Sequence, residues 1–249
     1  GLIVFYLSLN GYIDAKIEHN TNKKNKDIIE LSSIALGFKS NFNKIFSVSG
    51  EFKISKPDEI EIIHSYLEIN LSDFLSFKIG IVKIPFGHYN INYSPPLTTM
   101  GIIPLTHEYI VPMIWSEPGV TFFGKYQTGL PFIFNYELTI TNGLGEGSFL
   151  SDSGNQDAKQ NLYEDNNSDK QFAGRIVATL VPSIDIISFH LGFSGVIGRY
   201  DNNQNNEYSG TNIDFLLEIG PFFLIGDHDF LKISGELIQF NIERDFKTL

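Results

Sequence analysis

LSFKIGIVKIPFG (residues 75–87) opens the stretch that decides the fold, which runs from Leu75 to Thr139. A Pro-rich segment follows at 88–119, and VTFFGKYQTGLPFIFNYELT (residues 120–139) closes the stretch. Apolar residues alternate with polar or small ones in the first and last segments. A period of two places each set on one face of a strand. The stretch therefore predicts a strand, a long loop, and two strands joined by a tight turn.

The same alternation recurs along the chain and gives eleven strand candidates, whereas no segment shows a helical period. One face is apolar and includes the set Ile63, Leu67, Ile69 and Leu71 together with Phe52, Phe77, Phe134, Phe189 and Phe215. The opposite face carries ionisable side chains, namely Asp14, Lys16, Glu18, Lys39, Glu51, Lys53, His64, Glu68, Lys78, Lys125, Glu137, Arg175, Asp214, Glu218, Lys232 and Glu236. The pattern predicts an all-β chain with one apolar and one charged face.

Composition excludes several classes of protein. The chain has 249 residues, enough for one large β domain, and no cysteine, so disulfides and cysteine-ligated metal sites are absent. A net charge of −11 argues against a nucleic-acid partner, because phosphate binding needs clustered lysine and arginine. No apolar run is long enough for a helical membrane span, but the strands of a membrane barrel leave only a weak hydropathy signal.

The connections between the strand candidates alternate in length. The short ones are 40–44, 71–74, 127–131, 181–185 and 226–229, and the long ones are 20–29, 55–61, 85–117, 142–170 and 199–210. Outer-membrane barrels have this asymmetry, with tight periplasmic turns and long extracellular loops. We therefore expect residues 1–249 to form one antiparallel transmembrane β-barrel with the long loops outside the cell. A strand at 7–18 begins it, and residues 1–6 fit either a remnant of a signal region or part of that strand.

Burial of the charged face gives a second argument for this fold. Charges in the core of a soluble barrel cost several kcal/mol each unless they are paired, so these side chains fit a water-filled lumen. The alternative is a soluble all-β ligand-binding protein with the charged face outside and the apolar face inside. Eleven strands with the long connections at one end favour the barrel, with the apolar face toward outer-membrane lipid and the ionisable side chains lining a pore.

Short motifs in the deciding stretch resemble those of bacterial outer-membrane porins. Lys83-Ile84-Pro85-Phe86-Gly87 ends one strand, Trp115-Ser116-Glu117-Pro118-Gly119-Val120 opens the next, and Asn135-Tyr136-Glu137-Leu138, Thr141-Asn142-Gly143 and Ala173-Gly174-Arg175 follow. The nearest resemblance is to the phosphate-selective porin O and P family and its uncharacterised relatives, over residues 11–243. It implies a passive channel for small hydrophilic solutes or ions in a bacterial outer membrane, without enzymatic activity or a cofactor. It also implies a homotrimer and a loop folded inward to constrict the pore.

The chain departs from that family in two ways. It stops after an odd-numbered strand, whereas a closed bacterial barrel has an even count, so we expect a missing C-terminal part and about 12–16 strands or more in the full protein. The resemblance implies an arginine ladder for phosphate, but this chain has only Arg175, Arg199 and Arg244. The expected lumen carries seven basic and eight acidic residues, which leaves the charge selectivity open.

The long loop at 85–117 is the expected constriction. It carries Ile102, Ile103 and other apolar residues that a freely solvated loop would not expose, and Pro95, Pro96, Pro104 and Pro112 stiffen it. We expect it to bend into the barrel, with the constriction-loop residues His88, His107, Glu108 and Trp115. The alternative is that its apolar surface packs against a neighbouring subunit or an outer loop.

Other chemistry has little support in the sequence. The six histidines show no zinc-binding spacing, and Gly143-Leu144-Gly145-Glu146-Gly147 lacks the helix that a dinucleotide site requires. The Asp-rich segment 151–169 does not match an EF-hand, and a solvated loop is the simpler interpretation. A non-conducting binding or structural barrel remains the alternative to a channel.

Overall fold

A computed structural model of the chain describes residues 6–18, 28–56, 59–92, 104–127, 131–146, 159, 162, 165, 168–180, 187–201, 203, 205–222 and 229–243. Eleven antiparallel strands form one sheet in chain order, which confirms the predicted all-β fold. The strands are β1 Tyr6–Glu18, β2 Ile28–Asn41, β3 Phe46–Lys56, β4 Glu59–Asn70, β5 Ser76–Lys83, β6 Ser116–Gln127, β7 Phe132–Thr141, β8 Gln171–Leu180, β9 Ile187–Arg199, β10 Glu207–Phe222 and β11 Asp229–Ile242.

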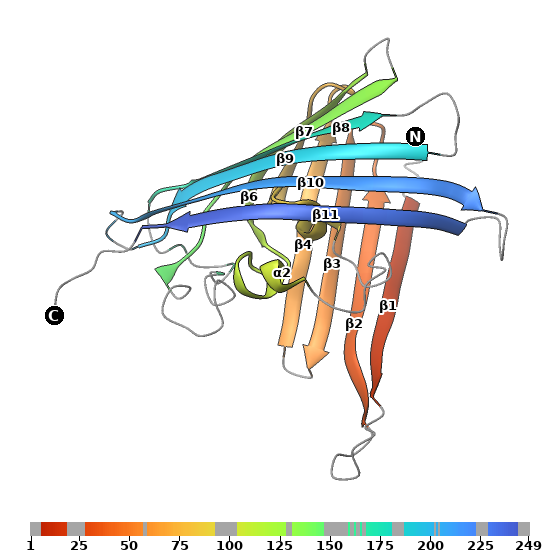
Figure 1. Cartoon of the computed structure of the whole chain (residues 1–249), viewed down its shortest axis with the longest axis horizontal. Helices are drawn as coiled ribbons and strands as arrows, with labels where there is room; N and C mark the ends of the chain where they lie inside the picture. Colours follow the sequence, from red (N-terminus) through yellow and green to blue (C-terminus); the bar gives the residue numbers. More distant parts are fainter. Residues whose placement is uncertain are drawn as a thin grey trace.

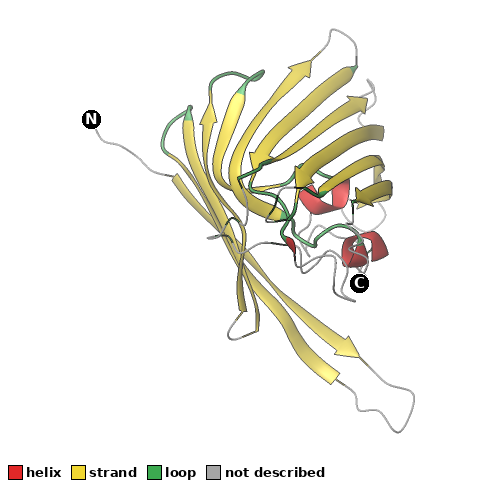
Figure 2. Cartoon of the chain, turned by 90° about the vertical axis from the view of Figure 1, so that its left-hand side faces the viewer, coloured by secondary structure: helices red, strands yellow, loops and turns green. Residues whose placement is uncertain are grey.

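The sheet curls into the wall of a barrel (Figures 1 and 2). Each strand pairs with its neighbours in sequence, so β1 and β11 are the outer strands of the sheet. Two short helices, α1 His88–Asn92 and α2 Leu105–Tyr109, belong to the connection between β5 and β6. They lie on the concave side of the sheet, as Figure 2 shows. The convex side is left to the outward side chains of the strands.

The convex side is apolar along most of the sheet. Leu191 and Phe193 of β9 are exposed there. The residues that alternate with them, Gly192 and Ser194, are buried on the concave side. Neighbouring strands bring aromatic rings together on this outer surface, as with Phe38–Phe52 and Phe77–Phe122. The five phenylalanines predicted on the apolar face belong to neither buried cluster of the described residues; they are Phe52, Phe77, Phe134, Phe189 and Phe215. The outward orientation of the apolar face is confirmed.

The alternation breaks at a bulge in β4. Glu51 of β3 pairs with His64, but the next residue, Phe52, pairs with Ile62, so Ile63 has no direct partner in this ladder. Ile63 is buried and packs with Ile114 on the concave side. The assignment of Ile63 to the outer face was therefore wrong, because an extra residue in one strand shifts which side chains point inward.

The predicted alternation of long and short connections also fails at one place and nearly disappears at another, where the connection expected at 199–210 is only 200–206 and the neighbouring short ones are 181–186 and 223–228. The long connection expected at 55–61 is taken up mostly by strand, since β3 ends at Lys56 and β4 begins at Glu59. The connections 84–115 and 142–170 are long, as expected. Residues 1–5, 93–103 and 147–158, which include parts of three predicted segments, lie outside the described residues.

The polarity of the two faces reverses toward the end of the sheet that bears the long connections. On β11 the outward residues change from Leu237, 72% exposed, to the polar Gln239 and Asn241. Over the same span Phe240, on the concave side, packs against a buried apolar cluster. The apolar surface on the outside thus gives way to an apolar core on the inside of the curled sheet.

Candidate functional site

The connection 84–115 is closed at its base by backbone and side-chain hydrogen bonds. The amide of Ile84 donates to the carbonyl of Trp115 at 2.9 Å. Asn90 of α1 is buried and donates to the carbonyls of Ile84 and Trp115, at 2.8 and 3.2 Å. Its Oδ1 accepts from the Trp115 amide at 2.7 Å. Asn90 therefore fixes α1 against the point where the chain leaves β5 and enters β6.

Further contacts attach the same connection to the far strands of the sheet. The amide of Gly87, a residue with φ of 77°, donates to Ser194 Oγ of β9 at 3.0 Å. On β11, Glu236 accepts from the Tyr89 amide at 2.5 Å and contacts His107 Nε2 of α2 at 3.1 Å. The Tyr89 and His107 rings lie 4.6 Å apart between centroids. One carboxylate of β11 thus holds both short helices.

The near side of the connection contacts β4 and β5. Lys83 Nζ of β5 donates to the Ile91 carbonyl of α1 at 3.1 Å, and next to the connection, at the start of β6, Ser116 Oγ donates to the Ile63 carbonyl of β4 at 2.6 Å. The inward position of Ile63, produced by the bulge in β4, gives Ile114 its packing partner. The connection therefore crosses the concave side of the sheet from β4 to β11.

A buried apolar cluster fills the space between the connection and β8–β11. Trp115, Phe86 and Leu144 are fully buried in it, and Phe86 meets the rings of Trp115 and Phe240 edge to face. Tyr208 stacks on Phe240 with 5.9 Å between centroids. Trp115, predicted as a constriction-loop residue, is covered by neighbouring side chains in this cluster. It holds the connection against the wall.

A buried carboxylate joins two connections at the start of β6. Glu117 accepts hydrogen bonds from Trp115 Nε1 and from the Gly143 amide, both at 2.6 Å. Gly143 lies just after β7, in the connection to β8. Sequence reasoning missed Glu117, because the motif around it showed only a strand start and the alternation could not reveal a network between two loops.

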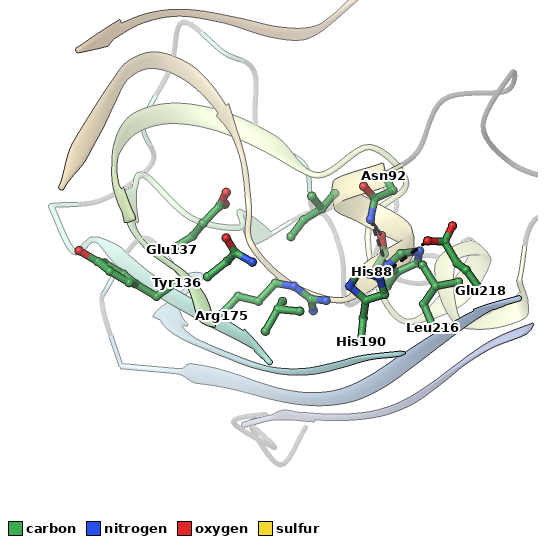
Figure 3. A pocket seen from close by; sticks show the side chains of 11 residues that line it. His88, Asn92, Tyr136, Glu137, Arg175, His190, Leu216 and Glu218 are labelled. Atoms are coloured by element: carbon green, nitrogen blue, oxygen red, sulfur yellow. Dashed lines mark hydrogen bonds and ion pairs between the residues drawn. The ribbon is translucent and has the colours of Figure 1, made fainter. Parts of the chain in front are cut away.

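A cavity of about 300 Å³ lies between α1 and the middle of the inner wall. Figure 3 shows Arg175 extending along the wall toward His88, with His190 beside it and Asn92 on the helix above. The residues around it come from α1 and four consecutive strands: His88, Ile91, Asn92, Asn135, Tyr136, Glu137, Arg175, Val177, His190, Leu216 and Glu218. Among the predicted lumen residues, the fold brings Glu137, Arg175 and Glu218 together with His88 in this cavity.

Each charged side chain around the cavity has an opposite charge beside it. Arg175 makes a two-pronged contact with Asp214, with N–O distances of 2.5 and 2.7 Å, and both side chains are almost fully buried. Gly192, on the strand between them, leaves the room that this pair occupies, because a Cβ there would lie 2.5 Å from both side chains. Such bidentate pairs fix geometry as well as charge.

The two carboxylates that line the cavity are also paired. Lys78 of β5 lies 3.5 Å from Glu137, and Lys232 of β11 lies 2.7 Å from Glu218. His190 contacts Thr179 at 3.0 Å through Nδ1 and lies 3.7 Å from Glu218 through Nε2. The charges around the cavity are therefore close to balanced.

His88 is the titratable group that the connection brings to the cavity. Its burial lowers its pKa below the usual 6.5, and the nearby Asp214 and Glu236 carboxylates oppose that change only in part. Asn92 Nδ2 lies 3.1 Å from His88 Nδ1, so the amide donates to the ring and the proton of the neutral imidazole sits on Nε2. His88 therefore meets the cavity as a neutral donor near pH 7.

The remaining predicted residues lie on other strands and on α2. Glu51 lies 4.0 Å from His64, Glu68 is opposite Lys78 in the β4–β5 ladder, and Lys53 is buried. His107 is 1% exposed, and in this structure it contacts Glu236 instead of facing solute. Four other predicted residues do not line the cavity: Lys16 in β1, Lys39 in β2, Lys125 in β6 and Glu108 in α2.

Two features are absent from the described part of the chain. None of its helices has the length and apolar character needed to cross a membrane. Within the same residues, no group of three or more histidine, aspartate or glutamate side chains is arranged to hold a metal ion.

Comparisons with known proteins agree with the fold. No protein-family model matches the chain. An uncharacterized protein of Aquifex aeolicus is 25% identical over 251 residues, which cover 93% of this chain and 55% of that protein, so the chain spans about half the length of this relative. OmpT, an outer membrane protein of Vibrio cholerae solved in its trimer form, superposes with a TM-score of 0.53 at 10% identity.

The superposition on OmpT covers 96% of this chain and 78% of that chain. A loop L8 deletion mutant of the same protein aligns over 97% of this chain and 95% of its own, at 11% identity and a TM-score of 0.32. The similarity to the trimer-form structure concerns the fold, and the resemblance to phosphate-selective porins stays a prediction. The chain has the all-β, antiparallel fold of an outer-membrane porin barrel.

Proposed function

We propose that the protein is an outer-membrane porin, a water-filled channel through which small hydrophilic solutes or ions diffuse passively. The observation that carries the proposal is the division of the sheet into two surfaces. The convex surface exposes apolar side chains on strand after strand, far more than the few hundred Å² usual for a soluble monomer. The concave surface carries the charged and polar side chains.

The physical reason is the solvent that each surface suits. In the hydrocarbon core of a bilayer a sheet must satisfy its backbone hydrogen bonds internally, and curled antiparallel strands do this for all interior strands. Outward leucine, isoleucine and phenylalanine side chains then contact lipid, while inward ion pairs contact water in the lumen. A soluble protein would leave the apolar surface in water.

The connection 84–115 is proposed as the constriction. It is attached to β4, β9 and β11 on the concave side, so it divides the lumen instead of extending away from the barrel. Its described apolar side chains at Ile84, Val111, Ile114 and Trp115 pack inside the curl, which favours an inward loop over a subunit contact. A trimer, the form of the solved OmpT, is proposed for this protein as well.

A non-conducting binding or structural barrel is the second candidate. The cluster around Trp115 and Phe86 fills part of the interior with apolar side chains, and water does not pass through such packing. Conduction then needs the part of the lumen that this cluster leaves open. The two candidates differ in whether an open path remains.

Single-channel recording in planar bilayers separates the two candidates. The full-length protein, refolded in detergent and shown to migrate differently on a gel before and after boiling, is added to one side of the bilayer. Stepwise ohmic current increases are the expected result. Correctly inserted protein that never conducts would exclude the channel and support the non-conducting barrel. Protein that shows no heat-modifiable migration and stays in solution without detergent would exclude both.

A further inference from the structure

The cavity beneath α1 combines hydrogen-bonding groups of both kinds with balanced charge. Glu137 and Glu218 supply acceptor oxygens, and Arg175, His88 and the side-chain amides supply donors. A guanidinium carries five N–H donors, and the contact with Asp214 uses two of them. Hydroxyl groups suit such a wall, because each hydroxyl both donates and accepts.

Part of the cavity surface is apolar. Ile91 of α1, Val177 of β8 and Leu216 of β10 contribute aliphatic side chains to it. Small-molecule sites commonly combine apolar contact area with a few polar groups that fix orientation, and their volumes begin at about 300 Å³. The cavity has about that volume, so its occupant is small.

Charged solutes fit the cavity less well. An anion would have to compete with Asp214 for Arg175, and a cation would have to compete with Lys78 for Glu137 or with Lys232 for Glu218. Arg175 and Asp214 are almost fully buried, and separating such a pair leaves an uncompensated charge. A neutral solute avoids this cost and leaves the ion pairs in place.

We propose that this cavity is a binding site for a small, uncharged, polyhydroxylated solute of the size of a monosaccharide. Its hydroxyl groups bond to Asn92, Asn135 and the paired charges, and its C–H faces contact the aliphatic side chains. The inference deepens the proposed function, because the solute would reach the cavity through the lumen. The site lies at the inward loop and retards the passing solute there.

D-Glucose is the probe for the test, and binding is measured separately from conduction. Saturation-transfer NMR on the refolded protein in detergent is expected to show transfer to glucose protons. In planar bilayers, millimolar glucose is expected to reduce the ionic current reversibly. Glucose binding without any conductance would support this site and reject the channel. Conductance with no glucose binding, or with block by inorganic phosphate or spermidine instead, would reject this site and retain the channel.

Two variants with matched controls locate the binding. Val177→Phe fills the cavity from its apolar side, and Val120→Phe makes the same change in β6 away from the lining residues. Asn135→Leu removes a polar side chain that lines the cavity. Asn241→Leu makes the same change at the exposed end of β11, away from the cavity. Each lining variant is expected to weaken glucose binding at least about tenfold, by analogy with other polar sites deprived of a partner. The two control variants are expected to bind glucose like the wild type. If either lining variant folds and binds glucose like the wild type, the site is rejected.

Discussion

Arg175 and Asp214 form an ion pair that depends on a third residue. The pair spans β8 and β10 across Gly192 of β9, where a side chain would collide with it. Both charged groups are almost completely buried, so neither can turn to water when its partner is lost. The pair therefore couples three strands of the inner wall.

Removing one member of this pair is expected to cost more than removing both. Asp214→Ala leaves the Arg175 charge unpaired and is expected to lower the free energy of unfolding by about 3–5 kcal/mol. The double variant Arg175→Met with Asp214→Leu replaces the pair by apolar side chains and is expected to cost less. Urea titration of the refolded protein, read by gel mobility, measures both. A double variant less stable than the single one would contradict the argument.

His88 gives the stability a pH dependence of known sign. Because burial lowers its pKa below 6.5, the folded chain takes up this proton less readily than the unfolded chain. The contribution of His88 to stability is therefore constant above pH 6.5 and decreases as the pH falls below it.

Comparison of wild type with His88→Gln isolates this effect. Between about pH 8 and about pH 5, the free energy of unfolding is expected to decrease more for the wild type than for His88→Gln, because glutamine does not titrate in this range. The other histidines contribute equally to both proteins and cancel in the difference. Equal losses in the two proteins would show that His88 is not buried in a neutral form.

Sequence patterns predicted which residues face inward wherever the strands are regular. Arg175, Glu137 and Glu218 share a face by parity, and the fold brings them to one cavity. Ile63 could not be placed correctly, because a bulge is set by pairing with another strand and leaves no mark on the alternation. His107 was predicted as a constriction-loop residue, but its contact with Glu236, 129 positions away in sequence, could not be predicted.

The connection 84–115 is the element on which the proposed constriction depends. Sequence predicted its length and its apolar content, but α1 and α2 have only five residues each and too few turns to show a helical period. Its position is fixed instead by long-range contacts with β4, β9 and β11. These contacts could be seen only once the strands were placed in space.

Asn90 is expected to be the side chain whose loss loosens this element most directly. Asn90→Ala leaves the buried Trp115 amide without its acceptor, at a cost of about 1–3 kcal/mol. Limited proteolysis of the refolded protein is expected to cut the connection between β5 and β6 faster than in the wild type. Asn92→Ala, a change at an exposed position of the same helix, serves as the control. Equal cleavage of the two variants would show that Asn90 does not fix α1.

For the whole molecule, the long connections define which end of the barrel faces outward. In an outer-membrane barrel the long loops are extracellular, so 142–170 is expected outside the cell. Protease added to intact cells is expected to cleave within 142–170 before any short turn, because exposed polar loops are the preferred sites. Peptide mapping by mass spectrometry identifies the first cut. Cleavage only at the short turns would reverse the orientation.

The apolar band on the convex face has an edge that can be tested along one strand. On β10, Phe215 lies among outward apolar residues near the middle of the strand, whereas Thr211 lies nearer the end where the outward face becomes polar. Thr211 lies two residues before Ile213 and Phe215 two residues after it. Both side chains therefore point to the same side of the sheet. They differ in their expected depth in the bilayer and share the same strand and face.

Arginine at these two positions is therefore expected to have unequal effects. Phe215→Arg places a charge near the bilayer midplane and is expected to destabilise the membrane-inserted protein by about 2–4 kcal/mol, whereas Thr211→Arg, near the interface, is expected to cost about 0–1 kcal/mol. Denaturant titration of protein folded into lipid vesicles measures the difference, with protein in detergent micelles as a comparison. Similar costs at the two positions would mean that the convex face has no lipid-buried centre, which would remove the main support for a membrane channel.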